Sequence, residues 1–122
     1  MGFRILVTEP IPASNIHFLQ TVGEVTVGEQ GQFLTEESLL EVIGHYDALL
    51  CMLSTPVTSR VLEAAHQLKI VANFAVGYNN IDVQAAHRCN IQVANTPDVL
   101  TESCADFTMG LLLATTRRFN KA

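Results

Sequence analysis

The residues best suited to chemistry in this chain are Val76 and Gly77, which follow an apolar run at 70–75 and precede Asn79 and Asn80. Glycine carries no side chain, so a ligand can approach the backbone closely at such a corner. Backbone N–H groups beside the start of a helix favour small anions. The pattern therefore predicts an anion-binding corner at the end of a strand. A tight turn that needs a glycine and binds nothing would leave the same pattern, so the residues alone keep both interpretations open.

The histidines and cysteines show no spacing that is typical of a metal centre or a disulfide framework. No pair of histidines has the i, i+4 spacing, and no C-x-x-C occurs. These side chains are His17, His45, His66, His87, Cys51, Cys89 and Cys104. We therefore assign no metal ligand and no catalytic residue, and we expect reduced thiols and a cytoplasmic location.

Composition limits both the class of protein and its partners. The 122 residues are 48% hydrophobic and 16% charged, which is typical of a single compact domain with its own core. The net charge of −5, without a basic stripe, argues against nucleic acid as a partner. The longest apolar runs are too short to span a bilayer, so we expect no membrane partner.

Five short apolar runs alternate with segments that carry helix signals. The runs occupy residues 5–7, 25–27, 48–53, 70–75 and 91–94. Strands that are apolar on both faces and alternate with helices predict a parallel sheet covered by helices. The expected fold class is α/β, a flavodoxin-like, doubly wound parallel sheet of five strands. Ligands bind beyond the carboxyl ends of such strands, and residues 53–55 and 76–78 are the most promising ends.

Capping residues predict where the helices begin and end. The expected N-caps are Ser14, Thr35, Thr58, Asn79 or Asn80, and Thr101. The expected stops are Gly23, Gly44 and Asn90, the last of them in the left-handed conformation.

The last expected helix, residues 102–118, differs from the others because apolar side chains surround it almost completely. Its apolar positions include Phe107, Met109, Leu111, Leu112 and Leu113. A helix that is hydrophobic all round is normally buried on every side, and this pattern therefore predicts a partner domain or a second subunit. We therefore expect the chain to be part of something larger, with either a further domain or a second copy in a homodimer covering this helix.

The sequence lacks the key residues of two other α/β classes of protein. A phospho-acceptor receiver domain needs paired acids after the first strand and an aspartate at the end of the third, but the chain offers Glu9 alone and Cys51. A flavin mononucleotide module needs a phosphate loop rich in Ser, Thr and Gly after the first strand, where residues 8–14 read T-E-P-I-P-A-S.

The segments V-G-Y-N-N-I-D, A-N-T-P and V-L-T-E-S-C-A-D, followed by a leucine-rich helix and R-R, point to a specific family. In this order they resemble the D-isomer-specific 2-hydroxyacid dehydrogenases, most closely the glyoxylate/hydroxypyruvate reductase and 2-ketogluconate reductase members. The resemblance covers the whole chain in order of elements and is strongest over residues 70–118. It implies a two-domain enzyme that uses NAD or NADP to interconvert 2-oxo acids and D-2-hydroxy acids. Residues 1–98 would form its substrate domain, and residues 99–122 would hold an inter-domain helix that leads into a dinucleotide-binding domain.

The resemblance also assigns roles to individual residues. Backbone N–H groups of the residues matching Val76 and Gly77 hold the substrate carboxylate in this family, and those matching Leu53 and Ser54 line the other side of the cleft. Thr101 matches a threonine that approaches the cofactor. On the residues alone, Leu53 fits a core position, Ser54 fits a turn, and capping by itself would explain Thr101.

Members of this family carry a glycine-rich dinucleotide fingerprint, an orienting arginine, a glutamate and an acid–base histidine. In the order of the family's motifs, all of these come after the position that matches residue 122. The resemblance therefore implies that these 122 residues supply a carboxylate site and are inactive alone. The alternative is a stand-alone binding or regulatory module that performs no catalysis.

Overall fold

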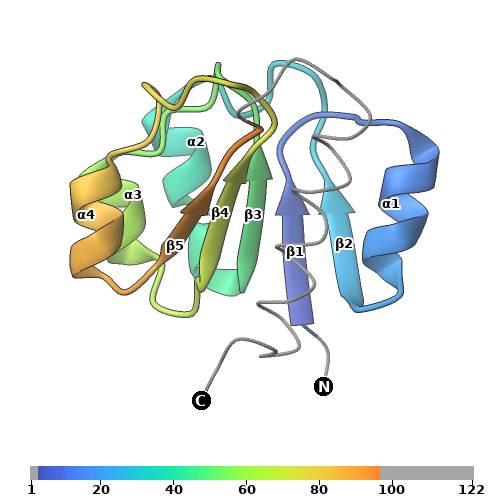
Figure 1. Ribbon diagram of the computed structural model, residues 1–122, viewed down its shortest axis with the longest axis horizontal. Helices are drawn as coiled ribbons and strands as arrows, with labels where there is room; N and C mark the ends of the chain where they lie inside the picture. The colour runs from blue at the N-terminus through green and yellow to red at the C-terminus, as the bar shows by residue number, and fades with distance from the viewer. Residues whose placement is uncertain (1–2, 97–122) are drawn as a thin grey trace.

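The computed structural model describes residues 3–96, which form a five-stranded, entirely parallel sheet with the strand order β2-β1-β3-β4-β5 (Figure 1). The strands are β1 (Phe3–Val7), β2 (Gly23–Val27), β3 (Ala48–Cys51), β4 (Ile70–Asn73) and β5 (Gln92–Ala94). This order is that of the flavodoxin-like doubly wound sheet. The expected fold class is thus confirmed.

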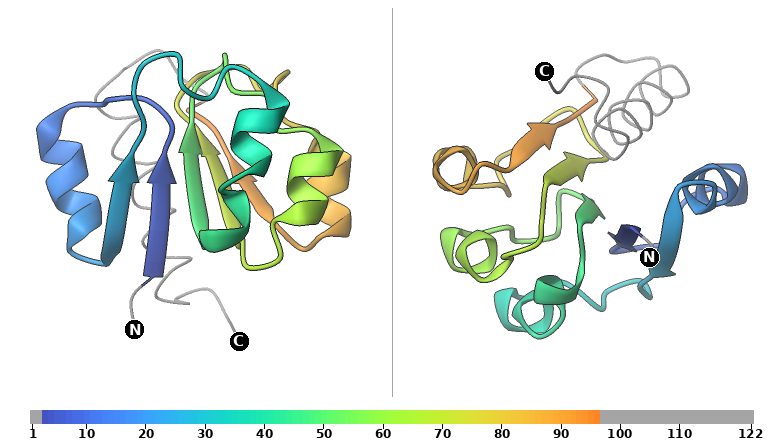
Figure 2. Two further views of the ribbon diagram at one scale, coloured as in Figure 1. Left: turned by 180° about the vertical axis from the view of Figure 1, so that it is seen from behind. Right: turned by 90° about the horizontal axis from the view of Figure 1, so that it is seen from below.

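The helices cover both faces of the sheet. They are α1 (Ala13–Gln20), α2 (Glu36–Leu40), α3 (Ser59–Ala64) and α4 (Val83–Arg88), with a short 3-10 helix, η1 (Ile43–His45). Figure 2 shows α2, α3 and α4 together on one face and α1 on the other. The expected inter-domain helix and the boundary at residue 98 fall on 97–122, outside the described residues.

Side chains of the strands alternate between two apolar cores, one on each face of the sheet. Leu6, Leu49 and Val71 point into the larger core, beneath the helices α2 to α4. Ile5, Val7 and Leu50 enter the smaller core and pack with Leu19 of α1. Because β3 and β4 are buried on both faces, their sequences are continuously apolar, with the exception of one residue at the end of β4.

Two of the expected caps are confirmed, and so is the left-handed residue after α4. The Thr35 side chain accepts a hydrogen bond from Ser38 N–H, and the Thr58 side chain accepts one from Val61 N–H. Asn90 has a φ of 62°. The side chains of Thr35 and Thr58 satisfy N–H groups that the first helical turn leaves unpaired, which is why the local sequence predicts these caps.

Two other caps were predicted wrongly, and the expected cap Thr101 lies outside the described residues. Ser14 lies inside α1, whose N-cap position is taken by Pro12 without any side-chain hydrogen bond. Asp82, and neither Asn79 nor Asn80, caps α4 by accepting from Ala85 N–H. The chain between β4 and α4 forms bends and turns, so the helix begins later than the asparagines suggest.

The two glycines expected to close helices do not do so. α1 ends at Gln20, and Gly23 is the first residue of β2. α2 ends at Leu40, ahead of Gly44, which lies in η1. In both places the chain turns through hydrogen bonds between residues close in sequence, such as Val22 N–H to Leu19 O, and no glycine adopts the left-handed conformation there.

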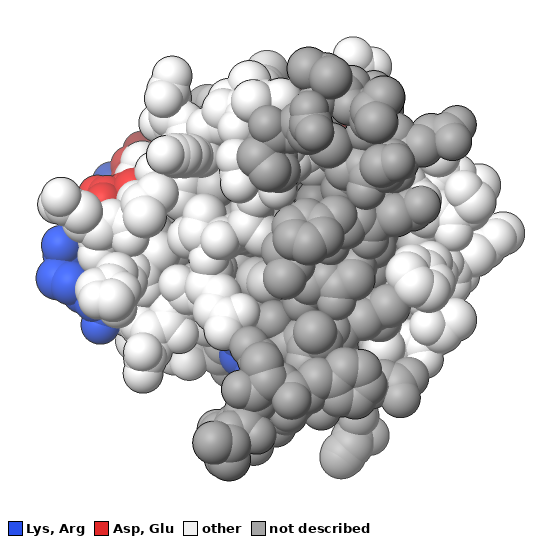
Figure 3. Space-filling view, viewed as in Figure 1, with Lys and Arg blue, Asp and Glu red and all other residues white. Residues whose placement is uncertain are grey.

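In the face shown in Figure 3, most charged side chains in view lie at the edge where α4 runs. Among residues 3–96, no helix has the length and apolar composition that crossing a bilayer requires.

Gly23 sits where β2 meets β1 too closely for a side chain. A Cβ at this position would lie 2.0 Å from the carbonyl oxygen of Phe3. We expect Gly23→Ala to lower the free energy of unfolding by about 1–3 kcal/mol, because the two strands must move apart. Gly44→Ala is the matched control, since the nearest atom to its Cβ would be Ala64 O at 3.7 Å. Urea unfolding of both variants is the measurement, and equal stabilities would contradict the close approach.

Cys51 ends β3 with its thiol completely buried, and it donates a hydrogen bond to Asn73 Oδ1 at 3.3 Å. Burial raises the pKa of the thiol from 9.0 to about 12, although the Asn80 amide beside it acts in the opposite direction. The thiol is therefore neutral at physiological pH and serves as a hydrogen-bond donor in the native protein.

This shift predicts how stability depends on pH. Above pH 9.0 the unfolded thiol loses its proton while the native thiol keeps it, so the free energy of unfolding falls until about pH 12. By about pH 10 the loss should reach about 1.4 kcal/mol relative to Cys51→Ser, whose hydroxyl donates a hydrogen bond but does not titrate. Urea unfolding at several pH values measures the difference. Parallel curves for the two proteins would contradict a buried, neutral thiol.

Candidate functional site

The loops that follow β3 and β4 lie side by side at the carboxyl edge of the sheet. β3 and β4 pair in register, with Cys51 opposite Asn73, so both strands end at the same level. Leu53 and Val76 are exposed on these loops, at 50% and 56% of their full accessible area. Parallel strands carry their ligands beyond such ends, and the structure thus brings the predicted residues of both loops together.

Gly77 faces Leu53 across the gap between the loops. A Cβ built on Gly77 would have Leu53 Cδ2 as its nearest described neighbour, at 3.9 Å. Gly77 does not have a positive φ, since Gly31 is the glycine of the described chain that does. Neither the backbone conformation nor packing against residues 3–96 therefore requires a glycine at this position. An open approach to the backbone from outside is what its missing side chain provides.

The N–H groups of Val76 and Gly77 donate no hydrogen bond to any residue of the described chain. Their carbonyl oxygens are occupied, by contrast. Asn95 Nδ2 donates to Val76 O at 2.7 Å, and Asn73 Nδ2 donates to Gly77 O at 2.7 Å. Unpaired, adjacent backbone N–H groups on a partly exposed corner are able to bind an anion such as a carboxylate.

Asn73, which is completely buried, and Asn80, which is partly buried, pair their side-chain amides beneath the two loops. The pair is reciprocal, with Nδ2–Oδ1 distances of 3.0 and 3.3 Å. Asn80 Nδ2 also donates to Met52 O at 3.0 Å and to Thr55 O at 2.9 Å. The pair therefore links the loop after β3 to the loop after β4. The sequence prediction treated Asn80 as a possible cap and overlooked Asn73.

A signal for Asn73 was present in the sequence. It is the one polar residue in the run I-V-A-N of β4, and it is completely buried. A buried amide costs stability unless its donors and acceptors find partners, so an asparagine at the end of an apolar strand indicates a hydrogen-bonded centre. Its partners, however, come from residues 51, 77 and 80, which only the fold identifies.

Ser54 is held at the rim of the site by a neighbouring strand end. Its hydroxyl donates to Glu9 Oε2 at 3.3 Å, and the buried Thr55 and Thr8 hydroxyls below it are 3.2 Å apart. The carboxylate of Glu9 thus competes with any ligand for the Ser54 hydroxyl.

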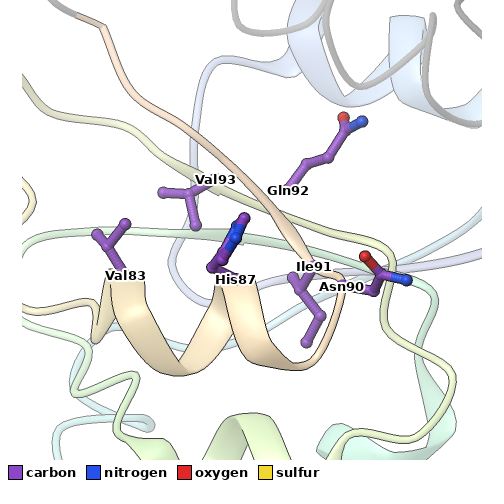
Figure 4. A pocket seen from close by; sticks show the side chains of 6 residues that line it. All are labelled: Val83, His87, Asn90, Ile91, Gln92 and Val93. Carbon is purple, nitrogen blue, oxygen red and sulfur yellow. The ribbon is translucent and has the colours of Figure 1, made fainter.

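A separate hollow of about 480 Å³ lies between α4 and β5. Its lining is Val83, His87, Asn90, Ile91, Gln92 and Val93, with no residue from the loops after β3 or β4. Figure 4 shows Val83 and His87 projecting from α4 toward β5, while Gln92 points away from them. This hollow is therefore distinct from the predicted corner.

No group of three or more His, Cys, Asp and Glu side chains in residues 3–96 could hold a metal ion. No G-x-G-x-x-G segment occurs in the sequence. Thr101, the predicted cofactor contact, lies outside the described residues. The described residues thus offer backbone donors for an anion and no dinucleotide fingerprint.

Comparison with known proteins gives close relatives over nearly the whole chain. The chain is 47% identical to the glyoxylate reductase of Thermococcus kodakarensis over 119 residues, which are 98% of this chain and 36% of that protein. It is also 47% identical to the glyoxylate reductase of Pyrococcus furiosus, over 97% of this chain and 35% of that one. The chain thus spans little more than a third of the length of these relatives.

Solved structures share the fold. The TT0316 protein of Thermus thermophilus matches with a TM-score of 0.74 and 36% identity, over 98% of this chain and 38% of that one. The sequence model named "D-isomer specific 2-hydroxyacid dehydrogenase, catalytic domain" matches residues 5–120. With nearly every residue covered by that domain, the chain belongs to the D-isomer-specific 2-hydroxyacid dehydrogenase family.

Proposed function

We propose that this chain provides the substrate-carboxylate site of an NAD(P)-dependent oxidoreductase that interconverts 2-oxo acids of the glyoxylate or hydroxypyruvate type and D-2-hydroxy acids. The observation that carries the proposal is the pair of N–H groups at Val76 and Gly77, which have no hydrogen-bond acceptor within residues 3–96. Gly77 lies beside Leu53, whose Cδ2 would be 3.9 Å from a Cβ on Gly77, and the family resemblance implies that Leu53 and Ser54 form the opposite wall of a substrate cleft.

The chemistry of the corner suits a carboxylate better than a neutral ligand. Two adjacent N–H donors match the two oxygens of one carboxylate, and charge-assisted hydrogen bonds are stronger than neutral ones. Glycine at 77 keeps the approach open, and the exposed apolar side chains of Leu53 and Val76 can contact the carbon atoms of a small substrate. These residues bind and orient the acid, and none of them is placed to move a proton.

Hydride transfer needs groups that the described residues do not offer. NAD or NADP supplies the hydride in the proposed reaction, and the relatives of this chain are almost three times as long. We propose that the rest of such a protein holds the cofactor, that Thr101 approaches it, and that the complete enzyme is a cytoplasmic homodimer.

The carboxylate site predicts the effect of Gly77→Ala. The new methyl group fits within the described protein but occupies the approach to the N–H groups. We expect the thermal unfolding midpoint to stay almost unchanged and the affinity for glyoxylate to fall about tenfold or more, equivalent to about 1.4 kcal/mol. Nuclear magnetic resonance titration of the ¹⁵N-labelled chain with glyoxylate measures both the affinity and the amides that respond.

Gly44→Ala is the control for this titration, because it adds the same methyl group far from the carboxyl edge, in η1. It should bind glyoxylate like the wild type. If Gly77→Ala binds as tightly as Gly44→Ala, or if the amides of Val76 and Gly77 do not respond in the wild type, the proposed carboxylate site is wrong.

Turnover gives a second test. The 122-residue chain is expected to bind glyoxylate without oxidising NADH or NADPH, since no described residue serves as the acid–base group. Absorbance of the reduced nicotinamide, followed with the purified chain and glyoxylate, measures this. Steady oxidation that scales with protein concentration would show that these residues hold the complete catalytic site.

A further inference from the structure

We propose that three asparagines, Asn73, Asn80 and Asn95, are positioning residues that aim backbone N–H groups at the ligand. Each donates a side-chain hydrogen bond to a carbonyl oxygen of the loops at the carboxyl edge. By holding the carbonyl, each fixes the direction of the next N–H along the chain. This inference rests on the proposed carboxylate site and adds Leu53 and Tyr78 to its backbone donors.

The geometry of the peptide bond carries the argument. The peptide bonds of the described residues are all trans, so each C=O and the N–H of the following residue point in opposite directions. Asn95 Nδ2 holds Val76 O at 2.7 Å, and the N–H of Gly77 must therefore point away from Asn95. Asn73 Nδ2 holds Gly77 O at 2.7 Å, which turns the N–H of Tyr78 away from the buried amide.

The loop after β3 follows the same rule. Asn80 Nδ2 holds Met52 O at 3.0 Å, together with the backbone N–H of Thr55 at 3.0 Å, so the N–H of Leu53 points away from both donors. The N–H groups of Leu53, Gly77 and Tyr78 have no hydrogen-bond acceptor within residues 3–96, as this geometry requires. Three side-chain amides, two of which are bonded to each other, thus leave three N–H groups on two adjacent loops without an acceptor in the described residues.

The N–H of Val76 is fixed differently and provides an internal reference. Its preceding carbonyl, Ala75 O, accepts from the backbone N–H of Thr96 at 2.9 Å, without a side chain. Removal of an asparagine side chain leaves this hydrogen bond in place. A positioning role therefore predicts that the Val76 donor persists in variants that lose the Gly77 donor.

Asn73 and Asn80 are themselves held in place by other residues, which is what a positioning residue requires. Asn73 Oδ1 accepts from the Cys51 thiol at 3.3 Å and from Asn80. The backbone carbonyl of Asn80 accepts from Val57 N–H at 2.8 Å, next to the bridge between Val57 and Ile81. Neutral amides also add donors without adding a charge beside the bound anion.

Asn95→Leu is the most direct variant, because Asn95 lies at the surface and its side chain contacts only Val76 O among the described hydrogen-bond partners. Leucine keeps the approximate shape and adds no charge. The matched control is Asn79→Leu, since Asn79 is exposed and its side chain has no hydrogen-bond partner within residues 3–96. The probe is glyoxylate, added to the ¹⁵N-labelled 122-residue chain.

In the wild type and in Asn79→Leu, glyoxylate should shift the amides of Val76, Gly77, Tyr78 and Leu53. In Asn95→Leu the response of Gly77 should be lost, that of Val76 should remain, and the affinity should fall about tenfold. If Asn95→Leu responds like the wild type, the positioning role is wrong while the carboxylate site stands. If the wild type shows no response at Val76 and Gly77, the carboxylate site itself is wrong.

Hydrogen exchange in the wild type tests the same geometry without any variant. The amides of Leu53, Gly77 and Tyr78 should exchange rapidly in the free protein and more slowly with saturating glyoxylate, because they point outward. Protection of these amides in the free protein would overturn the inference, even if Asn95→Leu failed to fold.

Discussion

The candidate site depends on the in-register, parallel pairing of β3 with β4. Because Cys51 lies opposite Asn73, the two strands end at the same level and release their loops side by side. The two buried strands thus bring the backbones of the loops after β3 and β4 together, and no long side chain is needed to connect the loops. The same pairing leaves carbonyl groups at the strand ends that must find donors away from water.

A small set of neutral polar side chains meets that requirement. Asn73 and Asn80 use their donors on carbonyls of both loops, and the Cys51 thiol supports Asn73 from below. Unpaired polar groups in this position would cost stability, so the network stabilises the fold and fixes the loops at once. The direction of the remaining N–H groups is a consequence of that arrangement, since each peptide unit is planar.

Much of the fold could be read from local patterns, because their causes are local. Thr35 and Thr58 cap helices since a short polar side chain bonds to a backbone N–H three residues ahead. Ser14 and Asn80 also have short polar side chains that could cap a helix. Ser14 lies inside α1 and Asn80 bonds to a loop carbonyl, because tertiary contacts decide which of the possible residues becomes the cap. Asn73 was overlooked because its role depends on partners from distant segments, which periodicity does not reveal.

The sequence by itself determined the alternation of strands and helices, the membership in the family and the corner at Val76 and Gly77, since these depend on residue type and order. Only the tertiary structure decided that the corner faces Leu53, that Ser54 bonds to Glu9, and that asparagine side chains hold the loop carbonyls. The physical reason is that hydrogen-bond direction is set by groups far apart in the chain. Residue spacing can place a donor at a strand end, but packing determines where it points.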